Sequence, residues 1–200
     1  MRAEDLTPWM MWRGYRMGCF PMGSEDSEEI LWYEVPRRAL FPIQGIHVSK
    51  SLAKTLRKSD FRVSFDEAFG DVIRACQRPG ENWITEPLAR VYEYLHADGW
   101  AHSCEVWRGE RLVGGVYGLA VGKIFSAESM FHRATDMSKV ALHAMIHHCR
   151  GLGFRVFDAQ VMNPHLESLG AYEVSARHYY NLLDQFAQSD TVWSRSKSMN

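Results

Sequence analysis

The sequence predicts an α+β fold, and three observations support that prediction. Residues 102–127 contain three apolar segments separated by short turns, a pattern typical of an antiparallel meander. A helical segment follows at 137–150, and another strand follows that helix at 154–161. Strands that form a run of their own before the next helix favour an antiparallel sheet with helices packed on it.

The first part of the chain, residues 1–65, is expected to form a small N-terminal α/β subdomain. A short amphipathic helix is predicted over 5–17, where Pro8 is tolerated because it falls in the first turn. Residues 18–23 are expected to break this helix, and residues 24–29 to form a solvated acidic loop. The remaining elements are predicted, in chain order, as two strands, a helix opened by Ser49 and a strand: 30–33, 40–43, 49–58 and 61–65.

The second part, residues 66–200, carries the regular pattern of helices and strands. Thr85 is a favourable N-cap residue for its second helix, which also has a proline near its start. The turn at 108–110 predicts that the first two strands of the meander form a hairpin. The predicted elements are, in chain order, 66–76, 86–97, 102–108, 111–120, 123–127, 137–150, 154–161, 165–169 and 175–187.

Composition excludes several classes of protein. A hydrophobic share of 46% and an aromatic share of 12% are ample for a packed core. The net charge of −1 argues against a generally basic nucleic-acid-binding protein, although a local basic patch remains compatible with it. The four cysteines lack CxxC spacing, which indicates reduced thiols. No signal peptide or apolar run of about 18 residues occurs, so we expect a soluble, cytoplasmic chain without a membrane partner.

The sequence lacks the common signatures of metal and nucleotide chemistry. His143 and His147 have the i,i+4 spacing of a metal pair, but no third ligand is evident, and a solvated helix face is the expected role. No phosphate-binding glycine fingerprint is present. The glycine-rich residues 114–118 fall inside a strand, where glycines mark a bulge or the close approach of another backbone. We therefore expect no metal and no cofactor.

Two polar features interrupt apolar segments. Asp158 and Gln160 lie two apart in a predicted buried strand, so their side chains should project to the same side. From these residues alone, a loop cap and a functional site are equally plausible. Glu128 interrupts a second apolar stretch. Burying a glutamate carboxylate costs several kcal/mol unless the carboxylate is paired with another group. For Glu128 a functional role is the favoured interpretation.

The helix at 49–58 gathers basic residues on one side, as the 3.6-residue period places them: Lys50, Lys54, Arg57 and Lys58. Arg62 and the nearby residues 37–38 add to the only concentrated positive region. A solvated surface and a contact surface for a phosphate backbone are both compatible with this pattern. Trp32 and Trp83 stand at loop edges, where indoles either fill a core or stack on nucleobases, at about 1–3 kcal/mol per base.

Short motifs occur in a defined order along the chain: residues 18–21, Trp32 ahead of 36–37, 83–85, 102–103, 105–107, 112–118, 127–131, 138–139, 158–161 with Asn163, and 168–170. Together they resemble the motifs of the leucyl/phenylalanyl-tRNA–protein transferase family. They occur in family order over nearly the whole chain. Such an ordered series is far more specific than any single short motif.

The resemblance implies both a fold and an activity. It implies a C-terminal domain similar to the acetyltransferase (GNAT-type) fold, which uses aminoacyl-tRNA in place of acyl-CoA. Residues 150–153 follow their helix instead of preceding it, so the pyrophosphate loop of acyl-CoA enzymes is missing, as expected. The family moves Leu or Phe, and Met less well, from charged tRNA to the N-terminal Arg or Lys of a protein. In bacteria this addition marks the acceptor for ATP-dependent degradation. We expect a monomer.

The resemblance also assigns roles to residues. It implies that Asp158 and Gln160 act at the catalytic step, and that Trp32 and Trp83 hold the 3′-terminal adenosine of the tRNA. Further substrate contacts implied by the resemblance are the aminoacyl side-chain pocket and the polar network around the reacting ester: Val116 and Met130, and Glu128 and Asn163. Val116 stands where the family would have Met, which suggests a slightly wider pocket. The basic helix is expected to contact the tRNA backbone.

A mechanism follows from the chemistry of the substrates. The donor ester is already activated, and the acceptor α-amine has a reference pKa of about 7.7–8.0, so positioning and a proton path should suffice. A neutral carboxamide is a weak acceptor, so Gln160 is expected to orient the amine through its carbonyl oxygen. Asp158 is expected to polarise and fix that carboxamide.

Two other classes of function remain open. One is an acyl-CoA-dependent N-acetyltransferase, and the other is a non-catalytic module that binds tRNA or protein N-termini. The missing pyrophosphate loop disfavours the first, and the presence of Asp158 and Gln160 disfavours the second. The sequence does not determine the donor order, the oligomeric state or the acceptor proteins.

Overall fold

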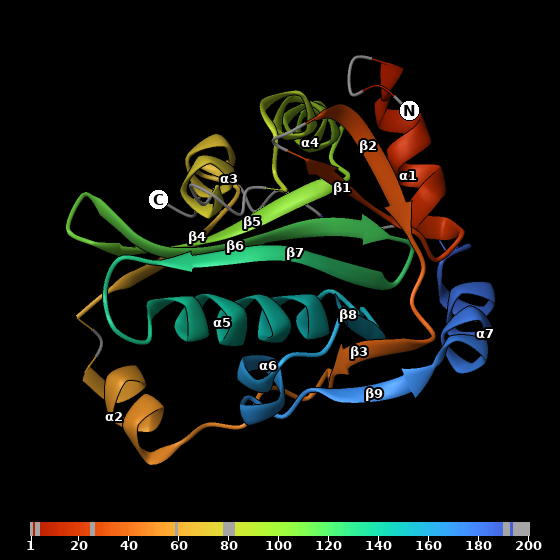
Figure 1. Cartoon of the computed structure of the whole chain (residues 1–200). Helices are drawn as coiled ribbons and strands as arrows, with labels where there is room; N and C mark the ends of the chain where they lie inside the picture. Colours follow the sequence, from red (N-terminus) through yellow and green to blue (C-terminus); the bar gives the residue numbers. More distant parts are fainter. Residues whose placement is uncertain are drawn as a thin grey trace.

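The computed structural model describes residues 2, 5–24, 27–58, 60–77, 83–189 and 193. The strands are β1 (Phe20–Ser24), β2 (Ser27–Tyr33), β3 (Arg37–Phe41), β4 (Arg62–Phe65), β5 (Ala101–Arg108), β6 (Arg111–Val121), β7 (Ile124–His132), β8 (Val156–Gln160) and β9 (Tyr172–Ser175). A seven-stranded sheet has the order β4-β5-β6-β7-β8-β3-β9, and β1 and β2 form a separate two-stranded sheet (Figure 1).

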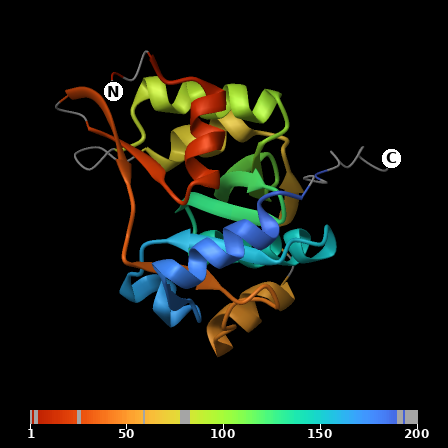
Figure 2. The same ribbon diagram turned by 90° about the vertical axis from the view of Figure 1, so that its right-hand side faces the viewer.

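The helices are α1 (Pro8–Arg16), α2 (Lys50–Lys58), α3 (Phe69–Cys76), α4 (Glu86–Ala97), α5 (Met137–Gly151), α6 (Pro164–Ser168) and α7 (Ala176–Phe186). α1, α3 and α4 cover one face of the sheet and α5 covers the other (Figure 1). The side view shows the same layers, with α1 and α4 together on one side (Figure 2). The α+β prediction is therefore confirmed. In the part of the chain that the structure describes, no helix is long and apolar enough to cross a membrane.

One strand pair departs from the antiparallel pattern and positions the site. β7 and β8 are parallel, and they pair only over Ile124–Ser126 and Val156–Asp158. Beyond these residues β7 continues to pair with β6 as far as His132. β8 instead ends at Gln160. The two strands therefore separate just before Glu128 and Gln160.

Several predicted elements are confirmed and others need correction. Residues 18–29, expected as a helix break and an acidic loop, instead contain β1 and the first residues of β2, although residues 25–26 lie outside the described part. The expected strand 123–127 extends to His132, and β9 was not predicted at all. β3 and β4 belong to the first 65 residues, yet both pair within the large sheet. The domain boundary at residue 65 remains a prediction.

The glycine-rich segment of β6 behaves as its sequence predicts. The register shifts between Tyr117 and Gly118, which marks a bulge. A Cβ atom on Gly118 would lie 2.2 Å from the backbone oxygen of Ser126, so only glycine fits this close approach. The hairpin turn is also confirmed, because Arg108 pairs with Arg111.

Candidate active site

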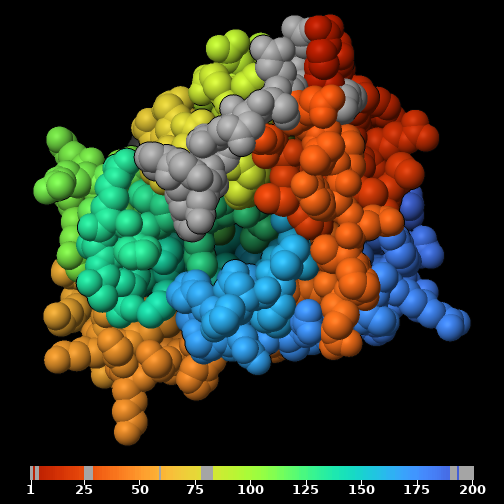
Figure 3. Space-filling view, in the orientation of Figure 1, coloured from red at the N-terminus to blue at the C-terminus, as the bar shows by residue number. Residues whose placement is uncertain are grey.

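A pocket of about 680 Å³ opens where β7 and β8 separate. Its mouth is a hollow between β7, the segment around α6 and the N-terminal hairpin (Figure 3). Residues of β7 form one wall and residues 159–161 form the opposite one. The side chains that matter most in it are Phe20, Met22, Phe41, Trp83, Val116, Glu128, Met130, Leu142, Gln160, Asn163, His165 and Leu166.

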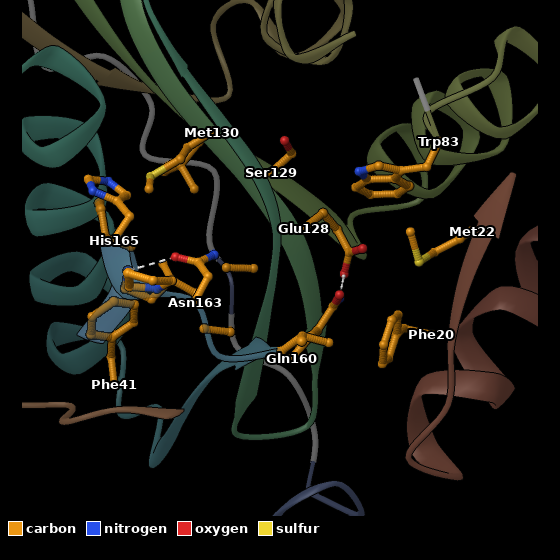
Figure 4. A pocket seen from close by; sticks show the side chains of 17 residues that line it. Phe20, Met22, Phe41, Trp83, Glu128, Ser129, Met130, Gln160, Asn163 and His165 are labelled. Carbon is orange, nitrogen blue, oxygen red and sulfur yellow. Dashed lines mark hydrogen bonds between the residues drawn. The ribbon is translucent and has the colours of Figure 1, made fainter. Parts of the chain in front are cut away.

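The pocket has two apolar sides with a polar centre between them (Figure 4). Phe20, Met22 and Trp83 form one side and belong to the hydrophobic cluster under α1 and α4. The other side belongs to the cluster around α5 and consists of Phe41, Val116, Met130, Leu142 and Leu166. Two separate apolar groups could therefore bind on either side of the polar centre.

Glu128 and Gln160 form that polar centre (Figure 4). The Gln160 Nε2 atom donates to Glu128 Oε1 over 2.8 Å. An ionised carboxylate only accepts hydrogen bonds, so the amide nitrogen must face Glu128 and the carbonyl oxygen of Gln160 must face elsewhere. The Tyr92 hydroxyl donates to Glu128 Oε2 over 2.9 Å. Burial raises the pKa of Glu128 to about 7.

Asp158 lies behind this centre and is fully buried. Its carboxylate accepts two hydrogen bonds from Arg38, at 2.8 Å from Nε and 2.6 Å from Nη2. The Ser126 and Tyr179 hydroxyls donate to it over 3.0 and 2.8 Å. Arg38 is itself buried, with its guanidinium carbon 4.8 Å from the centre of the Phe20 ring and 4.6 Å from that of Tyr179. Asp158 is thus saturated by structural partners, and it does not line the pocket.

The expected relation between Asp158 and Gln160 needs correction. Gln160 has a φ of 63°, which is rare outside glycine, so the alternation of a regular strand ends at this residue. Asp158 accepts a hydrogen bond from the backbone nitrogen of Gln160 over 2.9 Å, whereas the side-chain amide donates to Glu128. Asp158 therefore fixes the backbone turn, and Glu128, in place of Asp158, fixes the carboxamide.

Most of the other predicted substrate contacts do meet in the pocket. Trp83, Val116, Met130 and Asn163 all line it. The Asn163 Oδ1 atom caps α6 by accepting from the backbone of Leu166 over 2.9 Å, which leaves its amide nitrogen to donate.

Trp32 lies outside the pocket, unlike the other predicted contacts. It pairs with Pro21, one residue from the pocket-lining Phe20 and Met22, so strand alternation turns it to the other side. There its ring packs over Gly14 of α1, where a Cβ atom would lie only 2.1 Å from the indole. The contact of Trp32 with adenosine remains a prediction that this geometry does not support.

The basic helix face (Lys50, Lys54, Arg57 and Lys58) is largely exposed and does not line the pocket. Asp136, at the start of α5, accepts hydrogen bonds from the hydroxyls of Ser51 and Thr55 over 3.5 and 3.3 Å and so holds α2 beside Lys54 and Lys58. Arg38 is not part of the positive region, contrary to expectation, because it is buried against Asp158.

Two further hollows connect the pocket to the basic helix face. The first shares His165 with the pocket and is also lined by Lys139 and Asp136. The second shares Asp136 with the first and is lined by Lys54 and Lys58. The pocket and these two hollows therefore form a row of neighbouring depressions from the polar centre to α2, which we call the channel.

One group among the described residues has metal-ligand geometry: Asp66, His96 and His102. The Asp66 carboxylate already accepts from the ring of His102, the backbone of Ser103 and the indole of Trp193, each over 2.9 Å. His102 also faces the backbone oxygen of Gly99 over 3.0 Å. These contacts satisfy the group, and none of its members lines the pocket.

Sequence reasoning missed several residues that complete the site. Phe20 lies in residues 18–21, one of the motifs that carry the family resemblance, so it could have been assigned to the pocket. Arg38 and Tyr92 gave no local signal, because their partners lie 120 and 36 residues away in the chain. Their contacts arise only from the tertiary fold.

Comparison with known proteins decides the relationship of this chain. Residues 40–184 match the family described as leucyl/phenylalanyl-tRNA protein transferase, and residues 4–36 match the N-terminal domain of that family. The chain belongs to the leucyl/phenylalanyl-tRNA–protein transferase family. A member from Cereibacter sphaeroides is 47% identical over 195 residues, which cover 97% of this chain and 91% of the relative. A member from Shewanella baltica is 44% identical over 197 residues, covering 95% of this chain and 83% of the relative.

A comparison with solved structures adds little to this family assignment. A crystal structure of a functionally unknown conserved protein from Staphylococcus epidermidis shares 11% sequence identity and covers 70% of this chain and 69% of its own. Its TM-score of 0.34 is too low to support any conclusion about the fold.

Proposed function

We propose that this family member transfers Leu or Phe, and Met less well, from charged tRNA to the N-terminal Arg or Lys of acceptor proteins. The transferred residue then marks the acceptor for degradation in the bacterial cytoplasm, and the enzyme acts as a monomer. The observation that carries this proposal is the pocket itself. It places a Gln160–Glu128 centre between two apolar sides, in a chain whose relatives are named for this transfer.

The side formed around α5 suits the aminoacyl side chain. It is lined by aliphatic, aromatic and thioether groups, including Phe41, Val116 and Met130. Val116 is almost completely buried and lies opposite Met130 across the β6–β7 pair. A pocket of this kind distinguishes one methylene by about 1–3 kcal/mol, so it would favour Leu over Val strongly and Leu over Met only modestly.

The other side suits the 3′-terminal adenosine of the donor. The Trp83 indole offers a flat face for a base, and Phe20 and Met22 complete the apolar wall. The backbone oxygen of Trp83 accepts a hydrogen bond from Gly23 over 3.0 Å, which ties Trp83 to the hairpin. A base stacked there gains about 1–3 kcal/mol. The ester that joins adenosine and amino acid would then lie at Gln160.

The channel toward α2 suits the acceptor stem of the tRNA. The basic helix face ends this channel, and Lys54 and Lys58 line its last hollow. Lys and Arg side chains bind a phosphate backbone independently of sequence, which fits a donor chosen by its amino acid. Asp136 holds α2 through Ser51 and Thr55, and the basic side chains of the helix are exposed beside that contact.

Gln160 orients the reaction at the centre of the pocket. Its amide nitrogen is held by Glu128, so its carbonyl oxygen is directed to accept a hydrogen bond from the incoming amine. Asp158 contributes from behind, because it holds the strained backbone of Gln160 through the 2.9 Å bond to its nitrogen. We also propose an acetyltransferase-type (GNAT) architecture for residues 66–200, supported by the order β5-β6-β7, α5, β8 in that part.

The test is transfer of labelled amino acid to defined acceptors. The protein is incubated with radiolabelled Leu-tRNA and peptides that begin with Arg, Lys, Asp or Ala. The expected result is label on the Arg and Lys peptides only. Absence of label on every peptide, together with a thermal shift by acetyl-CoA, would overturn the proposal in favour of an acyl-CoA enzyme. Tight tRNA binding without transfer would overturn it in favour of a binding module.

A further inference from the structure

The proposed transfer requires a group that takes a proton from the acceptor, because an α-ammonium is not nucleophilic. Gln160 cannot hold the proton, since its carboxamide stays neutral. Asp158 is buried, and its carboxylate already accepts hydrogen bonds from Arg38, Ser126 and Tyr179. Among the described residues that line the pocket, the carboxyl group of Glu128 and the imidazole of His165 are the candidates for this role.

The geometry favours Glu128 over His165. Glu128 contacts the carboxamide of Gln160 directly, through the amide nitrogen that is bonded to the same carbon as the carbonyl oxygen that orients the amine. His165 is exposed at the mouth, and Figure 4 places it beside Met130 and Asn163, on the wall away from Trp83. No hydrogen bond between described residues joins His165 to Gln160 or Glu128.

We propose that Glu128 is the proton acceptor for the α-ammonium of the acceptor protein, an inference that rests on the function proposed above. The Glu128 carboxylate takes one proton from the ammonium, and the freed lone pair forms the C–N bond to the ester carbon. The C–O bond to the tRNA then breaks, and a second proton passes from the new nitrogen to the leaving 3′-oxygen. The proton on Glu128 returns to solvent, so the balance is one proton released per transfer.

The affinity of Glu128 for a proton suits this step. Burial brings its pKa to about 7, close to the reference value of about 7.7–8.0 for an α-amine. A base whose pKa lies near that of its partner and near the working pH is the most effective. An ordinary exposed glutamate would be too weak a base.

Tyr92 and Tyr15 are positioning residues for Glu128. The Tyr92 hydroxyl donates to the carboxylate over 2.9 Å, and it lies 2.8 Å from the Tyr15 hydroxyl. If Tyr15 donates to Tyr92, all three groups are satisfied, and the relay reaches from β7 through α4 to α1. Both tyrosines are buried, and their hydroxyls favour the ionised form of Glu128.

Other charged or titratable groups also face Glu128 from the packed elements. Asp158 on β8 raises the pKa of Glu128. Arg38 on β3 and Tyr117 on β6 interact with it electrostatically. The Tyr117 hydroxyl is buried and has no hydrogen-bond partner among the described residues. Tyr117 therefore serves as a matched control for Tyr92, because it carries the same hydroxyl without the bond to Glu128.

The experiment measures single-turnover transfer from Phe-tRNA to an Arg-initiated peptide across pH 5.5–9, a range of about two units on either side of the expected midpoint. The wild-type rate should rise with pH through about 7. Glu128→Gln should be slower by about 100- to 10,000-fold below that pH, and the defect should shrink above the pKa of the amine, which then arrives already deprotonated. Tyr92→Phe should move the wild-type midpoint upward by about one pH unit, and Tyr15→Phe by less. Tyr117→Phe should leave the midpoint unchanged.

The outcomes separate this inference from the proposed function. A defect in Glu128→Gln that is equal at every pH would mean a structural role only and would overturn the inference. A midpoint unchanged in Tyr92→Phe, with the variant shown to be folded by circular dichroism, would overturn the role of the relay. Both results would still leave wild-type transfer intact. Failure of the wild-type protein to label any peptide would instead overturn the proposed function.

Discussion

Replacing Asp158 by asparagine should destabilise the protein before it affects the chemistry. Asp158 and Arg38 form a bidentate ion pair in which both side chains are almost fully buried. A neutral carboxamide at this position cannot balance the guanidinium, so Asp158→Asn leaves a buried cation without its counter-charge. Removing one partner of a buried pair costs about 3–5 kcal/mol. That loss is large against the total stability of about 5–15 kcal/mol that is typical of a folded domain.

Two quantities are measured for Asp158→Asn and the wild type: the free energy of unfolding in urea and the melting temperature. For a chain of this length, about 1 kcal/mol shifts the melting temperature by about 2–4 °C, so Asp158→Asn should lower it by roughly 6–20 °C. Glu67→Gln is the matched control, because Glu67 pairs with Arg62 at 2.7 Å on the surface, where both side chains are about half exposed. An exposed pair contributes about 0–1 kcal/mol.

A second variant separates loss of charge pairing from loss of other contacts. Arg38→Met combined with Asp158→Leu removes both charges, and replacing a buried pair by apolar residues is often close to neutral. It should recover much of the stability that Asp158→Asn loses. If Asp158→Asn unfolds at the same urea concentration as the wild type, the structural role assigned to Asp158 is wrong.

Three further predictions concern specificity, tRNA binding and pH. Val116→Met should narrow the pocket and shift the Leu/Phe transfer ratio by about 10-fold or less; an unchanged ratio would remove Val116 from the side-chain pocket. Lys54→Gln with Lys58→Gln should raise the KM for charged tRNA and reduce its log–log salt slope by about one per lost contact, while Arg90→Gln on α4 should do neither. Glu128 binds its proton more tightly in the folded state, so wild-type stability should fall as pH rises from its ordinary value of 4.5 to about 7. Glu128→Gln should lack this decline and therefore gain about 3 kcal/mol relative to wild type between pH 4 and pH 8, as measured by urea unfolding at both pH values.

Local sequence patterns predicted those elements whose signal lies within the element itself. The meander β5-β6-β7, the helix α5 and the strand β8 all follow from periodicity and turn residues. The β1–β2 hairpin did not, because its stability depends on distant contacts, such as the bond from Gly23 to the backbone of Trp83. β9 has only four residues, and it is specified by its pairing with β3.

The residues of the site also divide into those with a local sequence signal and those whose role depends on distant contacts. Gln160 and Glu128 could be found from the sequence, because polar residues interrupt apolar strands there. Their relation to Asp158 could not, because it depends on the left-handed backbone of Gln160 and on the distant Arg38. Trp32 illustrates a further limit, since a shift of one residue along a strand turns a side chain to the opposite face.

The most direct test of the account is single-turnover transfer by Gln160→Ala at saturating charged tRNA. Gln185→Ala, the same change on the exposed side of α7, is the matched control. The account predicts that Gln160→Ala folds normally and binds Phe-tRNA, but that its transfer rate falls by about 100-fold or more, because the amine is no longer oriented. A folded Gln160→Ala that transfers Phe as fast as Gln185→Ala would contradict the claim that the reaction takes place between β7 and β8.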